Sequence, residues 1–239
     1  MEETCHGFVL KTIPYGDTGL IVKILTDTMG ATSFMVSNAK RRGKSSKAGL
    51  FSPMSHVSIT FVRKENRDLY GAKQTNIHHM YSSLLTDMRK PLVSVYMAEA
   101  LYKAISERTH EDELYLYAEA QMEKLDAMDN LQHFAQQFLV GLIDIFGFIP
   151  HGEYTKQTPE FSLNESTFVP AFASEPAFAI RDEAARYLSE LFTHHEPEQH
   201  YSRETRQETR RRLEDYLKLH LDGRFTLLSG EVLESVFDE

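Results

Sequence analysis

The sequence predicts an α+β protein in which a small five-stranded β-barrel or sandwich precedes an α-helical domain. Three observations predict it. Apolar and polar residues alternate with a period of two in the first eighty residues, the period changes to 3.6 from about Pro91, and basic charge is concentrated before that change. The length of 239 residues allows one large domain or two small ones. We expect a first domain over residues 1–80 and a helical domain over 81–239, with an irregular insert at about 151–180.

The expected strands are short and nearly regularly spaced, and they cover residues 8–13, 20–25, 32–36, 57–62 and 69–77. Tyr15-Gly16-Asp17 is a turn signal, because Gly tolerates positive φ and Asp hydrogen-bonds its own backbone. Closure of the strands into a barrel removes the exposed edges of an open sheet. Phe8, Phe34 and Phe61 alternate with polar neighbours, so we expect most of them inside the barrel.

The expected helices have apolar residues at helical spacing, and they cover residues 91–105, 112–128, 131–146, 181–192, 205–223 and 230–237. The third carries two adjacent apolar stripes and should be the central helix of its domain. Thr109 is the expected N-cap of the second helix. Thr205, with Glu208 three residues later, forms a capping-box pattern at the start of the fifth.

Charge is divided unevenly along the chain. The net charge is −9, yet residues 1–80 carry eleven Lys or Arg against six Asp or Glu, a balance of +5. The remaining residues carry fifteen cations against twenty-nine acids, a balance of −14. Such an asymmetry is typical of a basic binding module joined to an acidic body.

The densest basic run is the candidate nucleic-acid site. Five cations lie within eight residues between the third and fourth expected strands: Lys40, Arg41, Arg42, Lys44 and Lys47. Lys and Arg neutralise phosphates whatever the base sequence, and loops between strands flank the groove of small barrels that bind nucleic acid. Arg63, Lys64 and Lys73, at the ends of the last two strands, would extend the patch. The plainer alternative is a solvated loop, and stacking of unpaired bases on exposed aromatic rings is a second, weaker source of affinity.

No sequence motif points to catalysis. The chain lacks a phosphate-binding P-loop, a nucleophile elbow and an H-E-x-x-H pattern, so we expect no enzymatic activity and no cofactor. His194, His195 and His200 lie near acidic residues, but Pro197 forbids the helix that would align them on one ion. We therefore expect no metal site, and a metal-using hydrolase built on this loop would be revealed by elemental analysis.

The compartment follows from what the chain lacks. Cys5 is the single cysteine, and no run of residues is long and apolar enough for a signal peptide or a membrane span. We expect a cytoplasmic protein with no membrane partner.

A second basic run, Arg210-Arg211-Arg212, cannot form one flat patch on a helix, because consecutive residues point about 100° apart. We expect it to pair at the surface with Glu204, Glu208, Glu214 and Asp215.

The order and spacing of several motifs resemble the bacterial RecO family of recombination mediators. The resemblance rests on Gly7–Ile13, Tyr15-Gly16-Asp17, Leu20–Leu25, Ala39–Arg42, Leu50–Pro53, the Phe148-Ile149-Pro150 stop and the late helix from Arg211 to Leu221. It implies an N-terminal OB-fold that binds single- and double-stranded DNA and anneals complementary strands. It also implies that the protein, with RecR, helps to load RecA onto DNA coated by single-strand-binding protein, at the bacterial nucleoid and without hydrolysing ATP.

Two features of this chain qualify what the resemblance implies. Many relatives carry four cysteines in a zinc module, whereas His151–Ala179 contains none, so zinc is not carried over and Phe161–Val169 looks like the remnant hairpin. The acidic tail of single-strand-binding protein would need cations on the helical domain, and Arg89, Lys90, Lys103 and Arg108 are the candidates. The alternative function is a protein-interaction adaptor whose barrel binds a peptide and does not bind DNA.

Overall fold

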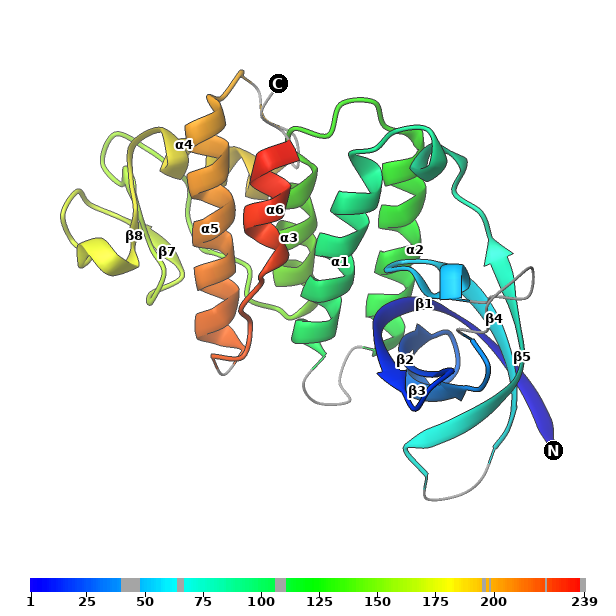
Figure 1. The fold of residues 1–239 in the computed structure, drawn as a ribbon. Helices are drawn as coiled ribbons and strands as arrows, with labels where there is room; N and C mark the ends of the chain where they lie inside the picture. The colour runs from blue at the N-terminus through cyan, green and yellow to red at the C-terminus, as the bar shows by residue number, and fades with distance from the viewer. Residues whose placement is uncertain are drawn as a thin grey trace. The chain divides into compact units, whose positions relative to one another are not determined.

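The computed structural model describes residues 1–39, 48–63, 67–105, 111–194, 197, 199–221 and 223–236 (Figure 1). It forms two compact units, Met1–Ala127 and Met128–Glu239, which are described separately. Among the helices described, none combines the length and hydropathy that a membrane span requires.

The first unit contains a closed five-stranded barrel, which confirms the predicted fold class. Its strands are β1 (Glu2–Tyr15), β2 (Gly19–Thr26), β3 (Gly30–Val36), β4 (His56–Val62) and β5 (Leu69–His79), in the order β1-β2-β3-β5-β4. The first half of β1 pairs with β4 and its second half with β2, with a bulge at Val9/Lys11. A short parallel pairing of β3 with β5 closes the barrel, and the short 3-10 helix η1 (Ala48–Phe51) precedes β4.

The barrel interior is filled by side chains from alternating strand positions, as the period of two predicted. Phe34 and Phe61 are fully buried and meet edge to face, with ring centroids 5.4 Å apart. Phe8 is buried too, but its ring stacks on His56 (4.2 Å) and tilts against Tyr115 of the helix α2 (Glu111–Ala127) (5.7 Å). The predicted interior position is confirmed for Phe34 and Phe61, whereas Phe8 is buried between the barrel wall and α2 because it faces the opposite side of β1 from Val9.

Two helices pack with the barrel in the same unit: α1 (Lys90–Ala104) and α2. Gly30, in the turn between β2 and β3, has φ of +60° and lies so close to Glu111 that a Cβ atom would overlap its carboxylate. Glu111 Oε1 accepts a hydrogen bond from Ala31 N (3.2 Å), and the Lys11 ammonium lies 4.7 Å from the Tyr102 ring centroid.

The compact unit therefore extends 47 residues past the barrel domain expected from sequence, to Ala127. The change from strands to helices falls between β5 and α1, as expected. The domain boundary at residue 80 stays a prediction. The expected N-cap Thr109 lies outside the described residues.

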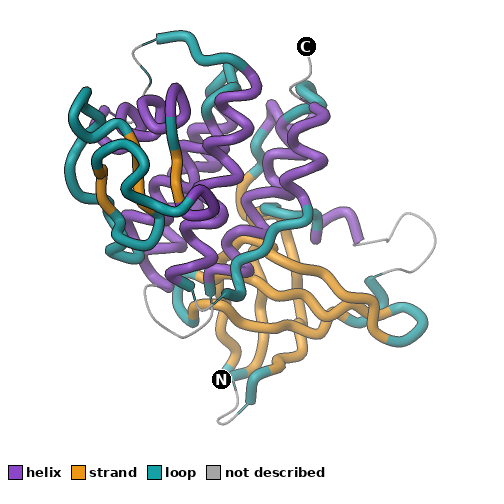
Figure 2. The backbone as a smooth tube through the Cα atoms, turned by 90° about the vertical axis from the view of Figure 1, so that its left-hand side faces the viewer, coloured by secondary structure: helices purple, strands orange, loops and turns teal. Residues whose placement is uncertain are grey.

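The second unit is built on α3 (Phe134–Ile145), α4 (Asp182–His194), α5 (Arg203–His220) and α6 (Ser229–Val236). Phe134, Phe138, Leu142 and Ile143 of α3 are buried, so α3 is the central helix that its two apolar stripes predicted. A small sheet of β6 (Glu160–Ser162), β7 (Thr167–Val169) and β8 (Ala179–Ile180) lies among loops (Figure 2). Its β6–β7 pair is the predicted hairpin.

The start of α5 differs from the prediction. The N-cap is Ser202, whose extended backbone ends the preceding loop and whose Oγ accepts from Thr205 N (3.2 Å). Thr205 lies inside the first turn and donates its hydroxyl to Glu183 Oε2 (2.6 Å). The predicted capping box at Thr205 was wrong, because Ser202, three residues earlier, already caps the free backbone N–H groups at the start of the helix.

The expected surface pairing of the arginine run is partly wrong. Arg212 does pair with Asp215 (3.5 Å), and Arg210 pairs with Glu214. Arg210, however, is buried, and it also pairs with Glu234 of α6. The prediction missed Glu234 because helical spacing reveals only neighbours on the same helix.

Candidate nucleic-acid interface

Two of the predicted DNA-binding cations lie at one end of the described barrel. Arg63 follows β4 and lies 3.5 Å from Glu3, while Lys73 on β5 forms an ion pair with Glu2. The register of β1 against β4 places both acids there, because Glu2 pairs with Val62. The other six predicted cations lie outside the described residues: Lys40, Arg41, Arg42, Lys44, Lys47 and Lys64.

Counting charges shows where the basic excess of the first eighty residues lies. The described part holds five cations and five acids, which balance: Lys11, Lys23, Arg63, Arg67 and Lys73 against Glu2, Glu3, Asp17, Asp27 and Asp68. Residues 64–66 add one Lys and one Glu. The whole excess of +5 therefore belongs to residues 40–47, which join β3 to η1 along the chain.

Exposed rings that could stack on bases are few. The candidate rings in the barrel are Phe8, Tyr15, Phe34, Phe61 and Tyr70. Tyr15 at the end of β1 is 53% exposed, next to the exposed Ile13 side chain on the same strand. Tyr70 is half-buried, and its ring lies 5.3 Å from that of Phe61. The other three are the buried phenylalanines, so Tyr15 is the accessible ring of this set.

Three histidines from different strands meet beside α2, a cluster that sequence reasoning missed. The ring centroids of His6 and His78 are 4.0 Å apart, and those of His78 and His56 are 4.5 Å apart. Asp27 Oδ2 lies 3.0 Å from His6 Nδ1, and His56 Nε2 lies 3.2 Å from the Tyr115 hydroxyl. His56 is 3% exposed, and its Nδ1 has no hydrogen-bond partner among the described residues.

The surroundings of His56 and His78 disfavour the protonated form of each imidazole. Burial, followed by the proximity of His78, His79 and His6, lowers the pKa of His56 to about 4. Burial and His6 also lower the pKa of His78. Among the residues that the structure describes, no group of three or more His, Cys, Asp or Glu has the arrangement of a metal site.

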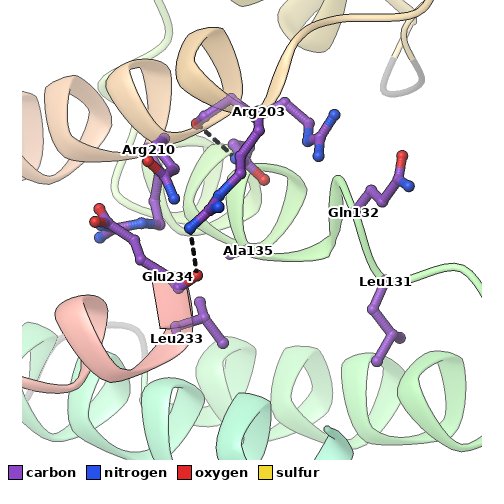
Figure 3. A pocket seen from close by; sticks show the side chains of 10 residues that line it. Leu131, Gln132, Ala135, Arg203, Arg210, Leu233 and Glu234 are labelled. Carbon is purple, nitrogen blue, oxygen red and sulfur yellow. Dashed lines mark hydrogen bonds and ion pairs between the residues drawn. The ribbon is translucent and has the colours of Figure 1, made fainter. Parts of the chain in front are cut away.

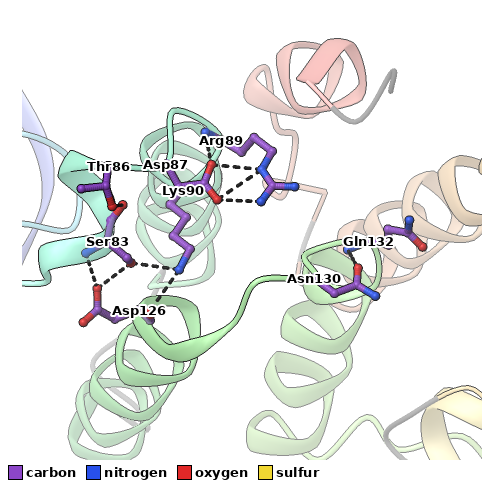
Figure 4. A network of polar contacts seen from close by, with 8 residues as sticks. All are labelled: Ser83, Thr86, Asp87, Arg89, Lys90, Asp126, Asn130 and Gln132. Atoms are coloured by element: carbon purple, nitrogen blue, oxygen red, sulfur yellow. Dashed lines mark hydrogen bonds and ion pairs between the residues drawn. The ribbon is translucent and has the colours of Figure 1, made fainter.

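Of the four cations expected to receive an acidic tail, the three that the structure describes do not lie together on one patch. Lys90 is 2% exposed, and its ammonium donates to Ser83 Oγ and to the Asp126 carbonyl (both 2.9 Å), a network shown in Figure 4. The Arg89 guanidinium donates to both oxygens of Asp87: Nε to Oδ1 at 3.0 Å and to Oδ2 at 3.2 Å, and Nη2 to Oδ2 at 2.7 Å. These and the Arg89 backbone N–H lower the pKa of Asp87 to about 2.

Lys103 is half-buried in the last turn of α1, thirteen residues from Lys90. At 1.5 Å per residue, the two lysines are separated by roughly 20 Å along the helix. Arg108 lies outside the described residues. The candidate partner site stays a prediction, and the burial of Lys90 gives that side chain a role in the fold.

The second unit contains a recess that the sequence did not suggest (Figure 3). The recess is open to solvent and is lined on one side by Arg203, Arg206 and Arg210 of α5. Each guanidinium is tied to the framework: Arg206 donates to Tyr201 O (2.6 Å), Arg203 donates to Glu234 O (3.3 Å), and Arg210 pairs with Glu234. The contacts of Arg203 and Arg210 with Glu234 hold α6 against α5.

Comparisons with known proteins cover both parts of the chain. The family model for the N-terminal part of recombination protein O matches residues 1–81, and that for its C-terminal part matches residues 85–228. The DNA repair protein RecO of Phocaeicola vulgatus is 30% identical over 99% of this chain and all of its own length. The RecO proteins of Bacteroides fragilis (27%) and Flavobacterium psychrophilum (28%) also match over their whole lengths and over 100% and 99% of this chain.

The architecture agrees with these matches, because a closed five-stranded barrel followed by helices is the arrangement that the RecO resemblance implied. Family membership supports a role in DNA repair and recombination and implies interaction with DNA. The chain belongs to the RecO family of DNA repair proteins.

Proposed function

We propose that this protein binds single- and double-stranded DNA through its barrel and acts as a non-enzymatic mediator of recombinational repair. One observation carries the proposal. The described part of residues 1–80 has equal numbers of cations and acids, so the whole basic excess of these eighty residues belongs to residues 40–47. Five cations so close together neutralise several phosphates and release the counterions condensed on them. Tyr15, exposed at the end of β1, offers one stacking surface for an unpaired base.

Contacts of this kind suit strand annealing. Phosphate contacts position a strand without reading its sequence, and they leave the base edges free to pair with a second strand. The acidic remainder of the chain, with a balance of −14, repels phosphates and confines DNA to the barrel. The same acidic surface suits contacts with proteins, and we propose RecR, single-strand-binding protein and, indirectly, RecA as the partners. A mediator of this kind works on chromosomal DNA, at the nucleoid of a bacterial cell.

The acidic tail of single-strand-binding protein would then be received near the C-terminal end of α1. Lys103 and Arg108 are the candidates there, since Lys90 is buried and Arg89 is engaged by Asp87. Reversing the charge at both positions should weaken binding of a peptide with the tail sequence. Equal binding by the doubly reversed variant would remove this site from the proposal.

A fluorescence titration with a single-stranded oligonucleotide at several salt concentrations tests DNA binding. Contacts with five or six phosphates predict a slope of log affinity against log salt of about −3.5 to −4, at about −0.7 per phosphate. Replacing the five cations of residues 40–47 by Ala should abolish most of the affinity and flatten the slope. A control variant replaces four exposed cations of the second unit, Lys156, Arg186, Lys218 and Arg224, and should bind like the wild type.

Three results would count against the proposal. Unchanged affinity in the five-alanine variant would remove DNA binding from residues 40–47. Equal loss in the control variant would mean that only total charge matters. No binding at low salt, or weak binding with little salt dependence, would favour the protein-interaction adaptor.

A further inference from the structure

The loop after β7 presents an aromatic side chain in a conformation that is unfavourable for it. Phe172 is 85% exposed, and its φ of +63° lies in the left-handed region. Ala173 N donates to Pro170 O (3.1 Å), so residues 170–173 form a β-turn with Phe172 as its third residue. Positive φ at this position alone matches a type II turn, which ordinarily has Gly or Asn there.

A buried carboxylate holds this turn in place. Glu160 of β6 is almost completely buried, and its two oxygens accept from Phe172 N (3.0 Å) and Ser174 N (2.9 Å). Arg181 donates Nε to Glu160 (2.6 Å) and Nη2 to Ser174 O (3.0 Å). The backbone on both sides of Ala173 is therefore anchored to the small sheet.

The ring itself is also positioned. The Arg181 guanidinium carbon lies 5.5 Å from the Phe172 ring centroid, a cation–π distance. Pro170, Ala171 and Ala173 are exposed beside it, and together residues 170–173 make up what we call the Phe172 knob. A single exposed apolar residue is ordinary. An exposed ring held at a residue with unfavourable φ by a buried carboxylate is not, because backbone strain of this kind is concentrated at functional positions.

We propose that the Phe172 knob is an anchor that inserts into an apolar pocket, rimmed by Lys and Arg, on a partner protein. Aromatic side chains that are ordered before binding make effective anchors, because little conformational freedom is lost on association. Charge selects the kind of partner. Residues 128–239 carry twenty acids against ten Lys or Arg, and the exposed Glu175 lies close along the chain, so phosphates are repelled and a basic rim is attracted.

This interaction is independent of DNA binding by the barrel, so either proposal can fail without the other. The first variant is Phe172→Gly in the full chain. Gly adopts positive φ without strain, so the thermal midpoint should be unchanged or higher while the ring is lost. A lower midpoint would mean that the ring stabilises the fold and would overturn the anchor.

Photocrosslinking identifies the partner. Phe172 is replaced by p-benzoylphenylalanine in the full chain, expressed in its native bacterial host, and Leu228, 79% exposed in the same unit, is replaced in the same way as a control. We expect one protein adduct specific to position 172. The adduct protein, once purified, should bind the full chain with an affinity that Phe172→Gly lowers at least about tenfold and that added salt weakens.

Each other result overturns the proposal. An adduct between two copies of this chain would make the knob a self-association surface, and an adduct with DNA would make it a stacking platform. The same adducts from both positions, or none from position 172, would leave the knob without a specific partner. An equal affinity of the purified protein for the wild type and for Phe172→Gly would exclude the ring as an anchor.

Discussion

The cations at the end of the barrel and the arginines of the second unit differ in what surrounds them. Arg63 and Lys73 are exposed, and their acidic partners Glu3 and Glu2 are half-buried and exposed, respectively. Arg206 and Arg210 are buried and donate to a carbonyl oxygen or to carboxylates of other segments. Both regions are rich in basic residues in the sequence. The comparison teaches that only exposed, weakly paired cations are available to a phosphate, whereas buried ones stabilise the fold.

The variant Arg210→Ala tests whether a buried arginine of the second unit contributes to stability and not to DNA binding. The change removes the buried cation that Glu214 and Glu234 share, while Glu234 keeps the exposed Arg211 as a second cation, so the free energy of unfolding should fall by about 3 kcal/mol. DNA affinity should not change. Urea unfolding and the oligonucleotide titration measure the two effects, with the exposed Arg224→Ala as the control. Equal stability of the two variants would show that the buried ion pairs contribute nothing.

The next effect is a loss of stability in acid. The pKa of His56 is about 4 in the folded protein and 6.5 as its ordinary value, so the unfolded chain takes up the proton first. Stability is therefore fully present above pH 6.5 and is lost as the pH falls towards 4, by about 2–3 kcal/mol. The positive charges that would face it are His6, His78 and His79, while Asp27 is the opposing acid.

His56→Gln should flatten this part of the stability profile. The measurement is urea unfolding at pH 7 and pH 5, with the exposed His151→Gln as the matched control. In the second unit, burial and Arg206 lower the pKa of His133 to about 4. This residue therefore also makes the folded protein less stable as the pH falls from 6.5 towards 4. An unaltered pH slope in His56→Gln would contradict the role of the histidine cluster.

The smallest expected effect is a change in DNA affinity when Arg63 and Lys73 at the end of the barrel lose their acidic partners. Glu2→Gln with Glu3→Gln leaves Lys73 and Arg63 without their acidic partners, and such solvent-screened pairs contribute little to the stability of the fold. If these cations extend the DNA site, affinity for single-stranded DNA should rise by a few-fold at low salt. The control is Glu153→Gln with Glu175→Gln in the second unit, which changes the net charge equally. The same affinity in both double variants would remove Arg63 and Lys73 from the site.

Local periodicity was sufficient for most strands and helices, but not for the first half of β1, for β8 or for the start of α5. The five strands and the central helix α3 were predicted from alternation and from apolar stripes, because each pattern lies within one segment. The interior positions of Phe34 and Phe61 followed from the same alternation. The basic run at residues 40–47 was likewise visible in the sequence alone, since it needs only neighbouring residues.

Other features depended on partners far apart in the chain. Tyr115 and Glu111 join α2 to the barrel, and burial of Lys90 depends on Asp126. The pairing of Arg210 with Glu234 and the hold of Glu160 on Phe172 each connect different elements. The sequence by itself determined which residues form strands and helices, which side of each is apolar and where positive charge is in excess. Only the tertiary structure decided which charges are buried, because burial depends on the segments that pack around a side chain and not on its neighbours in sequence.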